Sequence, residues 1–170
     1  MKLIIDTREQ TPLVFPKVKD VEVVVQGLPV GDYGALHGED PDSTIFERKS
    51  VADLFTSFSG NYKAEREKIL RAKAQELTYV LAIEGTATDI LAGHMYWKDG
   101  EAHESRKSGL AMIRQLMTLQ RKYALPVWFC AGRREMAWRI QEYFLAQERV
   151  GPEGGEDREV VEGKGKEVSL

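Results

Sequence analysis

The amino-acid sequence predicts an α/β fold in which a central sheet of about five or six strands is flanked by helices. Short runs rich in β-branched and aromatic residues alternate with segments whose apolar residues recur at helical spacing. Residues 77–83 are apolar throughout, which is typical of a central strand buried on both faces. At 170 residues, the chain is long enough for one domain with a hydrophobic core.

Three strands can be placed in the first third of the chain. Residues 1–5 and 21–26 are predicted to form short apolar strands, separated by a loop over residues 12–20. The strand over residues 44–49 alternates its side chains between two faces, because successive residues of a strand point in opposite directions. A carboxylate and an ammonium group therefore share one face, at Glu47 and Lys49.

A helix is predicted to begin directly after this last strand. Ser50 occupies the N-cap position and Asp53 lies three residues further on, which resembles a capping box with Asp in the place usual for Glu. Apolar side chains follow at helical spacing, at Val51, Leu54, Phe55 and Phe58. This tight corner between strand and helix can hold a divalent metal ion and a water molecule beside a phosphate.

The rest of the chain is predicted to alternate helices with strands. Helices are expected over residues 61–75, 105–123 and 134–147, a helical turn at 88–91, and a short strand at 126–130. Residues 92–103 are predicted to be irregular. The helix over residues 61–75 carries Lys and Arg on much of its surface, which is compatible with phosphate contacts or with a solvated face.

Four carboxylates lie at or near predicted strand ends, namely Asp6, Glu9, Asp32 and Glu47. Carboxylates that converge in one cleft repel each other unless a cation lies between them. Oxygen ligands of this kind suit Mg²⁺ or Mn²⁺ rather than Zn²⁺. The sequence therefore predicts a Mg²⁺ or Mn²⁺ site, whereas the three histidines show no spacing typical of metal ligands.

The order and spacing of these residues resemble the signature of the XPF-type structure-specific endonucleases. Gly31-Asp32 is followed, after fourteen residues, by Glu47-Arg48-Lys49 and, after three more, by Asp53. The run from Asp6 to Glu9 is similar to the end of that family's first strand. The resemblance covers roughly residues 2–147. It implies a nuclease core with a mixed sheet of restriction-endonuclease-like fold, Mg²⁺ dependence, and DNA cleavage near duplex/single-strand junctions such as flaps and forks.

The resemblance also implies roles for individual residues. The catalytic set is expected to be Asp6, Asp32, Glu47, Arg48, Lys49 and Asp53. Asp32, Glu47 and Glu9 are expected to bind the metal ion, and Lys49 is expected to orient the attacking water. Asp53 is expected to orient Lys49 or Arg48, or to cap its helix. DNA contacts are expected from Arg8, Arg48, Tyr62, Lys63 and Arg66.

Two features depart from the family pattern. After Gly60 the family usually has an Arg, an aromatic residue and, three residues later, a Gln, whereas this chain has Asn61, Tyr62 and Glu65. The Asn at position 61 removes one cation near the expected site, and this affects how a DNA strand would be bound. The sequence also ends without the tandem helix-hairpin-helix domain that usually follows the nuclease domain in cellular members.

The net charge of −3 is unevenly distributed along the chain. Residues 151–170 contain six acidic and three basic residues, so they account for all of it. Residues 1–150 are therefore neutral overall, and a neutral domain can still present a basic face to nucleic acid. We expect a nuclease domain over residues 1–150 and a disordered acidic tail over residues 151–170.

Three other functions remain open at this level. They are a Holliday-junction-resolvase-like nuclease, a non-catalytic DNA-binding partner subunit, and a DNA-binding module without chemistry. The expected partner is branched DNA, in a process of DNA repair or recombination.

A homodimer or a partner subunit is also expected, because the last predicted helix carries apolar residues, including Trp138 and Leu145, off its main apolar face. No signal-peptide core and no run of membrane-spanning length is found, so no membrane partner is expected. The single cysteine, Cys130, suits a reducing compartment, either the cytoplasm in association with the nucleoid or the nucleus.

Overall fold

The computed structural model describes residues 1–60, 62–93, 95–98 and 101–150. The predicted acidic tail, residues 151–170, and Asn61 lie outside the described residues. No helix in the described part of the chain is both long and apolar enough to cross a membrane.

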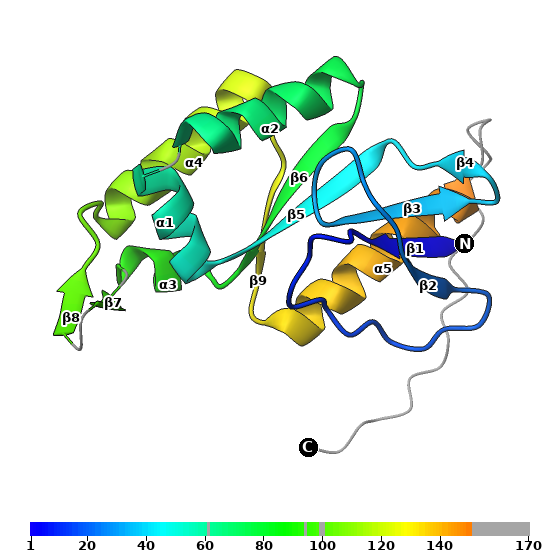
Figure 1. Cartoon of the computed structure of the whole chain (residues 1–170), viewed down its shortest axis with the longest axis horizontal. Helices are drawn as coiled ribbons and strands as arrows, with labels where there is room; N and C mark the ends of the chain where they lie inside the picture. The colour runs from blue at the N-terminus through cyan, green and yellow to red at the C-terminus, as the bar shows by residue number, and fades with distance from the viewer. Residues whose placement is uncertain (61, 94, 99–100, 151–170) are drawn as a thin grey trace.

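A seven-stranded mixed sheet forms the centre of the molecule (Figure 1). Its row of strands runs β2 (Glu22–Val25), β1 (Lys2–Ile5), β3 (Tyr33–His37), β5 (Thr44–Ser50), β6 (Thr78–Glu84) and β9 (Val127–Cys130), and β4 (Asp40–Pro41) pairs with β3. The pairs β1–β2, β5–β6 and β6–β9 are parallel, whereas β1–β3 and β3–β5 are antiparallel. The five strands whose ranges were predicted are all present, and β3 and the two-residue β4 complete the sheet.

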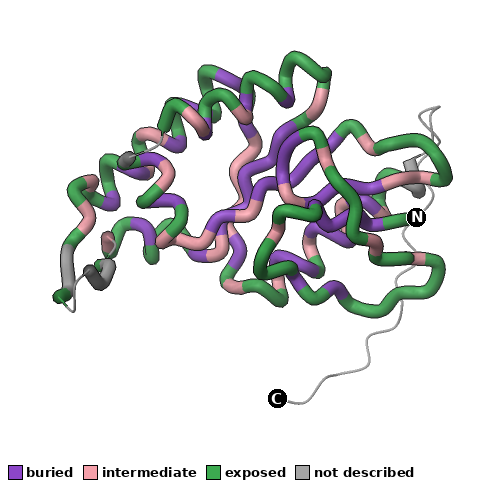
Figure 2. The backbone as a smooth tube through the Cα atoms, in the orientation of Figure 1, coloured by how far each residue is buried: buried purple, intermediate pink, exposed green. Residues whose placement is uncertain are grey.

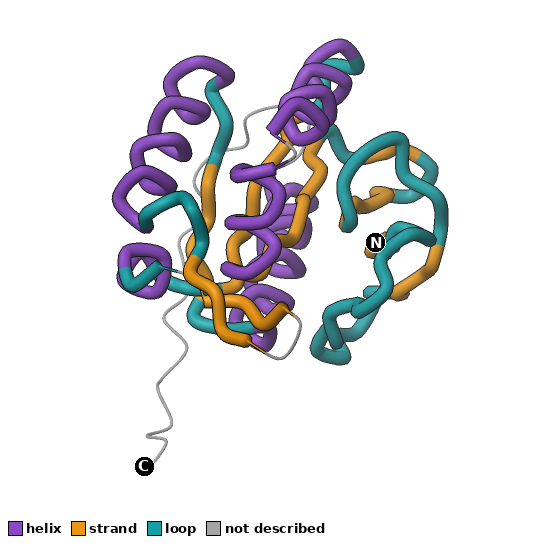
Figure 3. Tube along the Cα trace, turned by 60° about the vertical axis from the view of Figure 1, so that its left-hand side comes forward, coloured by secondary structure: helices purple, strands orange, loops and turns teal. Residues whose placement is uncertain are grey.

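Helices cover both faces of the sheet. One face packs against α1 (Val51–Gly60), α2 (Tyr62–Ala74), α3 (Ala87–Leu91) and α4 (Gly109–Tyr123), and the other packs against α5 (Arg133–Val150). Strand β6 lies between the two layers and is buried over most of its length (Figure 2), as its apolar sequence predicted. The loop-rich N-terminal strands lie to one side of this helix-covered part (Figure 3).

One predicted segment differs in the structure. Residues 92–103 were expected to be irregular, but β7 (Met95–Lys98) and β8 (Glu101–Glu104) form an antiparallel hairpin. Two signals in the sequence favour this arrangement: aromatic residues at positions 96 and 97, and an Asp-Gly pair at positions 99–100. Aromatic residues favour strands, and an Asp-Gly pair in a sequence is typical of a hairpin, so these local signals outweighed the polar composition.

The corner between β5 and α1 follows the pattern expected from its sequence. Phe46 is fully buried and packs edge-on against Trp128 and Phe144, with ring centroids 4.8 and 5.4 Å apart. Its neighbour Glu47 therefore points to the opposite face. The Ser50 hydroxyl accepts a 3.1 Å hydrogen bond from the backbone N–H of Asp53, which caps α1.

A short turn brings Asp32 to the middle of the sheet. The Asp32 backbone N–H donates to the Phe46 carbonyl at 2.8 Å, and its carbonyl accepts from the Asp6 N–H at 2.8 Å. Gly31 has φ +80°, and a Cβ at this position would lie 2.0 Å from the Ile45 side chain. A residue with a side chain cannot fit there, so the glycine lets the Asp32 turn lie directly against β5.

Candidate active site

A pocket of about 260 Å³ opens beside β5, and we call it the acidic pocket. Its lining comes from the β1–β2 loop, the turn before β3, strand β5 and helix α2, and consists of Arg8, Val30, Gly31, Asp32, Glu47, Lys68 and Arg71. Two of the carboxylates predicted from the sequence, Asp32 and Glu47, thus meet here. The other charged residues of the lining are cations, which suits a phosphate-bearing ligand.

Of the two carboxylates in the pocket, Asp32 is the one whose ionisation costs more free energy. Its Oδ2 accepts a 2.7 Å hydrogen bond from the backbone N–H of Arg48. Burial and the nearby Glu47 carboxylate raise the pKa of Asp32 from 3.8 to about 7. A positive charge placed between the Asp32 and Glu47 carboxylates would relieve their repulsion.

Glu47 is 3% exposed and is held by two lysines. Its Oε1 accepts hydrogen bonds from Lys68 Nζ at 2.6 Å and from Lys49 Nζ at 3.1 Å. Burial alone would raise the pKa of Glu47, but the two ammonium groups outweigh burial and lower it. Glu47 is therefore ionised at neutral pH.

Lys49 lies between two carboxylates beneath the pocket. Its Nζ donates to Glu47 at 3.1 Å and to Glu65 of α2 at 3.0 Å, and the residue is 7% exposed. Burial alone would lower the pKa of Lys49, but Glu47 and Glu65 raise it further than burial lowers it. Lys49 is therefore an ammonium group with two of its three N–H donors in use.

Asp6 supports the neighbouring loop and does not line the pocket. It is 1% exposed, and its carboxylate accepts from the backbone N–H of Arg8 at 2.8 Å and of Leu28 at 2.6 Å. The Arg8 guanidinium completes the set, with Nε 2.6 Å from Oδ1. Burial alone would raise the pKa of Asp6, but these donors lower it. Asp6 thus fixes Arg8 at the edge of the pocket. Arg8 is one of the residues expected from the sequence to contact DNA.

Glu9 and Arg48 lie together outside the lining of the acidic pocket, although the Glu9 charge also helps to raise the pKa of Asp32. Arg48 is on the face of β5 opposite Glu47, and its Nη1 donates to Glu84 at 2.8 Å. Glu9 accepts from the Thr11 N–H at 2.8 Å and lies 3.5 Å from Arg48 Nη2. The structure therefore does not bring Glu9, an expected metal ligand, into the lining that contains Asp32 and Glu47.

Four further predicted residues are also outside the lining. Asp53 bonds to Ser50 at the start of α1, so its observed role is the capping one. Tyr62 lies 6.2 Å from Phe58 between ring centroids, and Lys63 is exposed and lies 3.9 Å from Glu67.

Arg66 donates from Nε to the Tyr123 hydroxyl at 3.0 Å, which directs it toward α4. Nothing in these contacts joins any of the four to the acidic pocket.

Helix α2 supplies three residues to this site that the sequence reasoning did not assign. Glu65 holds Lys49, Lys68 holds Glu47, and Arg71 lines the pocket. They are three residues apart along the helix, so they share one face. Two features of the sequence could have indicated this contribution. One is the spacing of the three residues, and the other is Glu65 at the position where XPF-type nucleases usually have Gln. On the other face of β5, Glu84 pairs with Arg48.

The residues of the pocket fit a magnesium or manganese ion, although the fit rests on two carboxylates. No group of three or more His, Cys, Asp or Glu side chains close enough to hold a metal occurs in the described part of the chain. Mg²⁺ is commonly bound through one or two carboxylates, with water and substrate phosphates completing its shell. Asp32 and Glu47 meet that requirement, and the raised pKa of Asp32 indicates where positive charge is lacking.

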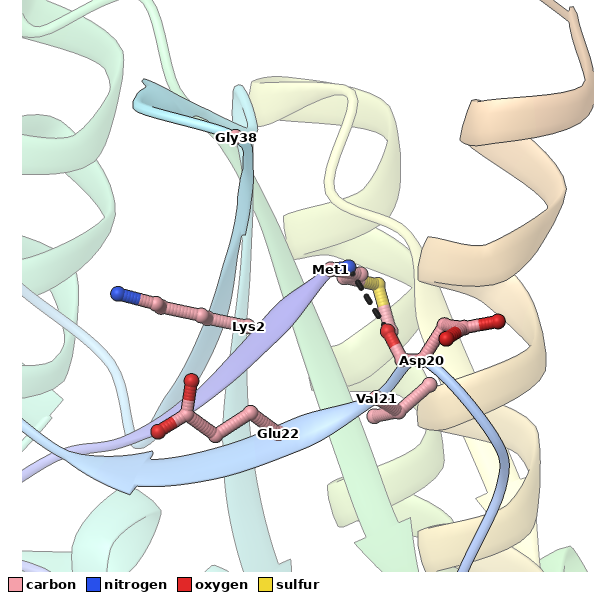
Figure 4. Close-up of a pocket in the computed structure, with 6 residues that line it drawn as sticks. All are labelled: Met1, Lys2, Asp20, Val21, Glu22 and Gly38. Atoms are coloured by element: carbon pink, nitrogen blue, oxygen red, sulfur yellow. Dashed lines mark hydrogen bonds between the residues drawn. The ribbon is translucent and has the colours of Figure 1, made fainter.

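A separate hollow of about 380 Å³ lies beside the N-terminus (Figure 4). Its lining includes Lys2, Glu22 and Gly38, and the Met1 ammonium donates to the Asp20 carbonyl at 3.0 Å. It lies at the Lys2 end of β1, whereas Asp6 and Asp32 meet at the Ile5 end. Its charged side chains do not converge on a common point in Figure 4, so we assign it no role in the site.

Comparisons with known proteins agree with this architecture. The family described as "ERCC4 domain" matches residues 5–141. A solved structure described as XPF from Aeropyrum pernix is similar with a TM-score of 0.58 and 22% identity, over 88% of this chain and 67% of that one. XPF from Aeropyrum pernix in complex with DNA gives a TM-score of 0.58 and 21% identity, over 87% and 66%.

This chain thus spans about two thirds of the length of those structures. At this identity the likeness establishes the fold alone, and it confirms the predicted α/β fold of restriction-endonuclease type. No curated protein sequence matches the chain.

Proposed function

Because this chain belongs to the ERCC4 domain family, as its resemblance to XPF-type proteins predicted, we propose that it is a metal-dependent, structure-specific DNA endonuclease. It would hydrolyse phosphodiester bonds near junctions of duplex and single strand, in flaps or forks. The observation that carries this proposal is the pair of carboxylates in one pocket, Asp32 and Glu47, with cations around them. The DNA complex of the similar Aeropyrum pernix protein supports DNA as the ligand.

In this proposal, the substrate phosphate enters a pocket whose edge is cationic. Arg8 has a side chain that is 60% exposed and is held in place by Asp6, so it can contact a phosphate with little loss of conformational freedom. Arg71 lines the same pocket from α2. Asp32 and Glu47 would hold the metal ion, which would supply charge stabilisation to the scissile phosphate and the departing oxygen.

Lys49 contributes a hydrogen-bond donor beneath these carboxylates. As an ammonium group it cannot accept a proton, so it does not act as the base. Two of its donors hold Glu47 and Glu65, and the third N–H can orient the attacking water or a phosphate oxygen. Glu65 keeps the Lys49 side chain in this position.

A second candidate function is a non-catalytic DNA-binding subunit. It is favoured by Lys68, whose Nζ lies 2.6 Å from Glu47 Oε1 and partly neutralises this carboxylate without a metal ion. The same pocket would then hold a DNA phosphate through Arg8, Lys68 and Arg71.

One experiment separates these candidates. Labelled flap, fork and four-way junction DNA is incubated with the protein in a titration of Mg²⁺ and Mn²⁺, and the products are mapped. Asp32→Asn and Glu47→Gln should abolish cleavage and leave most of the DNA affinity, since each removes a charged ligand but little volume. The exposed Asp40 and Glu39 provide the matched controls Asp40→Asn and Glu39→Gln.

The outcomes are distinct. Metal-dependent cuts near a flap or fork support the proposal, whereas paired symmetric cuts confined to four-way junctions indicate a resolvase-like nuclease. Binding without cleavage at any metal concentration indicates the non-catalytic subunit. Cleavage by Asp32→Asn or Glu47→Gln at the wild-type rate would show that the acidic pocket is not the catalytic site.

A further inference from the structure

A third pocket, of about 480 Å³, lies where the loop between β1 and β2 meets the start of α5. We call it the Val14 pocket, and its lining is Val14, Phe15, Pro16, Arg133 and Arg134. The loop supplies an apolar surface and the helix supplies two guanidinium groups. None of these residues lines the acidic pocket.

The loop that carries Val14 is firmly held on both sides of it. Leu13 and Phe15 are 3% and 8% exposed, and the Leu13 N–H donates to the Tyr33 hydroxyl at 3.0 Å. Phe15 packs edge-on against Tyr33 with ring centroids 5.5 Å apart. Because both neighbours point into the core, Val14 points outward and is 89% exposed.

Arg133 fixes the same loop from the side of the helix. Its Nη2 donates to the carbonyls of Thr11 at 2.7 Å and Pro12 at 2.9 Å, and its Nη1 lies 3.6 Å from Glu84. The apolar surface is thus formed before any ligand binds, so little ordering entropy would be lost on binding.

The remaining cation of this pocket is available to a ligand. Arg134 is exposed, and no hydrogen bond or ion pair joins it to another residue in the described ranges. No acidic residue belongs to the lining of the pocket. An apolar surface beside an unpaired guanidinium is complementary to a group that has both a flat apolar face and a phosphate.

We propose that the Val14 pocket binds an unpaired nucleotide of the DNA substrate, with its base against Val14 and its phosphate on Arg134. The proposal rests on the function proposed above. Arg8 lines the acidic pocket and Val14 lies six residues further along the same loop, so the two pockets are at most about 20 Å apart along the chain. That span corresponds to about six nucleotides of B-form DNA.

Such a site would read the structure of the substrate and not its sequence. Bases in a duplex are paired and stacked, so they cannot turn onto a protein surface without unstacking, whereas bases of a single strand can. A contact between an apolar surface and a base tolerates any sequence. The Val14 pocket would therefore favour DNA whose strand becomes single within a few nucleotides of the scissile bond.

The test measures binding in the absence of cleavage. In an Asp32→Asn background, fluorescence anisotropy compares a short blunt duplex with the same duplex carrying a single-stranded thymidine tail. Val14→Ser and Arg134→Ala should each weaken binding of the tailed DNA about fivefold and leave the blunt duplex unchanged. Arg134→Ala should also reduce the slope of log K against log salt by about 0.7 on the tailed DNA.

Two exposed residues provide matched controls on other surfaces. Val25 on β2 is 70% exposed, and Arg114 lies exposed on α4. Val25→Ser and Arg114→Ala should change neither affinity. A fluorescent base analogue placed at successive tail positions should report contact at one position, and Val14→Ser should abolish that signal.

Failure of this inference is distinguishable from failure of the proposed function. Equal losses on blunt and tailed DNA, no loss on either, or losses as large in the controls would each overturn the nucleotide site. Metal-dependent cleavage by the wild-type protein is measured separately. Cleavage without these tail-specific losses would overturn the Val14 pocket alone, and tail-specific losses without cleavage would overturn the nuclease assignment alone.

Discussion

Replacing Asp32 by Asn should make the metal-free protein more stable at neutral and alkaline pH. The Asp32 carboxylate lies beside the ionised Glu47 and no salt bridge joins it to a cation in the part of the chain that the structure describes. Asn keeps the volume and an oxygen that can accept from the Arg48 N–H, which now donates at 2.7 Å. The substitution therefore removes a repulsive charge and retains the local hydrogen bond.

The pKa of Asp32 sets the sign and the size of this effect. Its pKa is raised from 3.8 to about 7 on folding, so the folded state holds the proton more tightly than the unfolded state. The stability contributed by this proton is full below about pH 4 and is lost progressively as the pH rises to about 7. The difference in pKa corresponds to about 4 kcal/mol in total. Because water in the open pocket screens the two carboxylates, we expect about half of this, about 2 kcal/mol.

Urea unfolding without metal provides the measurement. At about pH 8 the free energy of unfolding of the Asp32→Asn protein should exceed that of the wild type by about 2 kcal/mol, or its Tm by about 4–8 °C, and the advantage should fall below about 1 kcal/mol near pH 4. The control Asp40→Asn, at an exposed position, should show no such pH dependence. Mg²⁺ should raise the Tm of the wild type more than that of Asp32→Asn. An Asp32→Asn protein no more stable than the wild type at about pH 8 would refute the reasoning.

Three further predictions follow from the same contacts. Lys49→Ala should reduce turnover at saturating DNA far more than Lys63→Ala, because Lys49 is buried between carboxylates whereas Lys63 is exposed; equal losses would contradict the role of Lys49. Glu65→Leu should cost about 3 kcal/mol in urea unfolding and Glu65→Gln less than half of that, because Gln keeps an acceptor for Lys49; equal costs would argue against the pairing. Trp138 is 53% exposed on α5, so a dimer through this helix should be seen by light scattering and lost in Trp138→Glu; a wild-type monomer, with and without branched DNA, would exclude it.

The strand that carries the site was predictable because strand periodicity is local. The alternation along residues 44–49 placed Glu47 and Lys49 on one face and Arg48 on the other, as the structure has them. The cap of α1 was predictable for the same reason, since Ser50 and Asp53 are only three residues apart. In both cases the signal is contained within a few consecutive residues.

Asp6 and Glu9 were placed less well because they follow a strand end. The direction of a side chain in a loop depends on the partners that the loop finds, and here Arg8 and the Leu28 N–H take both Asp6 oxygens. Glu9 turns to Thr11 and Arg48 instead. Proximity of carboxylates to strand ends therefore predicted the correct edge of the sheet but not the pocket lining.

The sequence indicated the charge and spacing of the α2 residues but not their contacts, because these depend on how that helix packs over β5. Glu65 and Lys49 are sixteen residues apart, yet their side chains meet at 3.0 Å. Once this contact is known, the charges of the site can be balanced: Glu65 and Glu47 are offset by the buried Lys49 and the half-buried Lys68, in a chain of ion pairs. Asp32 is left as the carboxylate of the acidic pocket without an equivalent partner, and its raised pKa follows from that. A divalent cation held between Asp32 and Glu47 would therefore supply the positive charge that the protein itself does not place there.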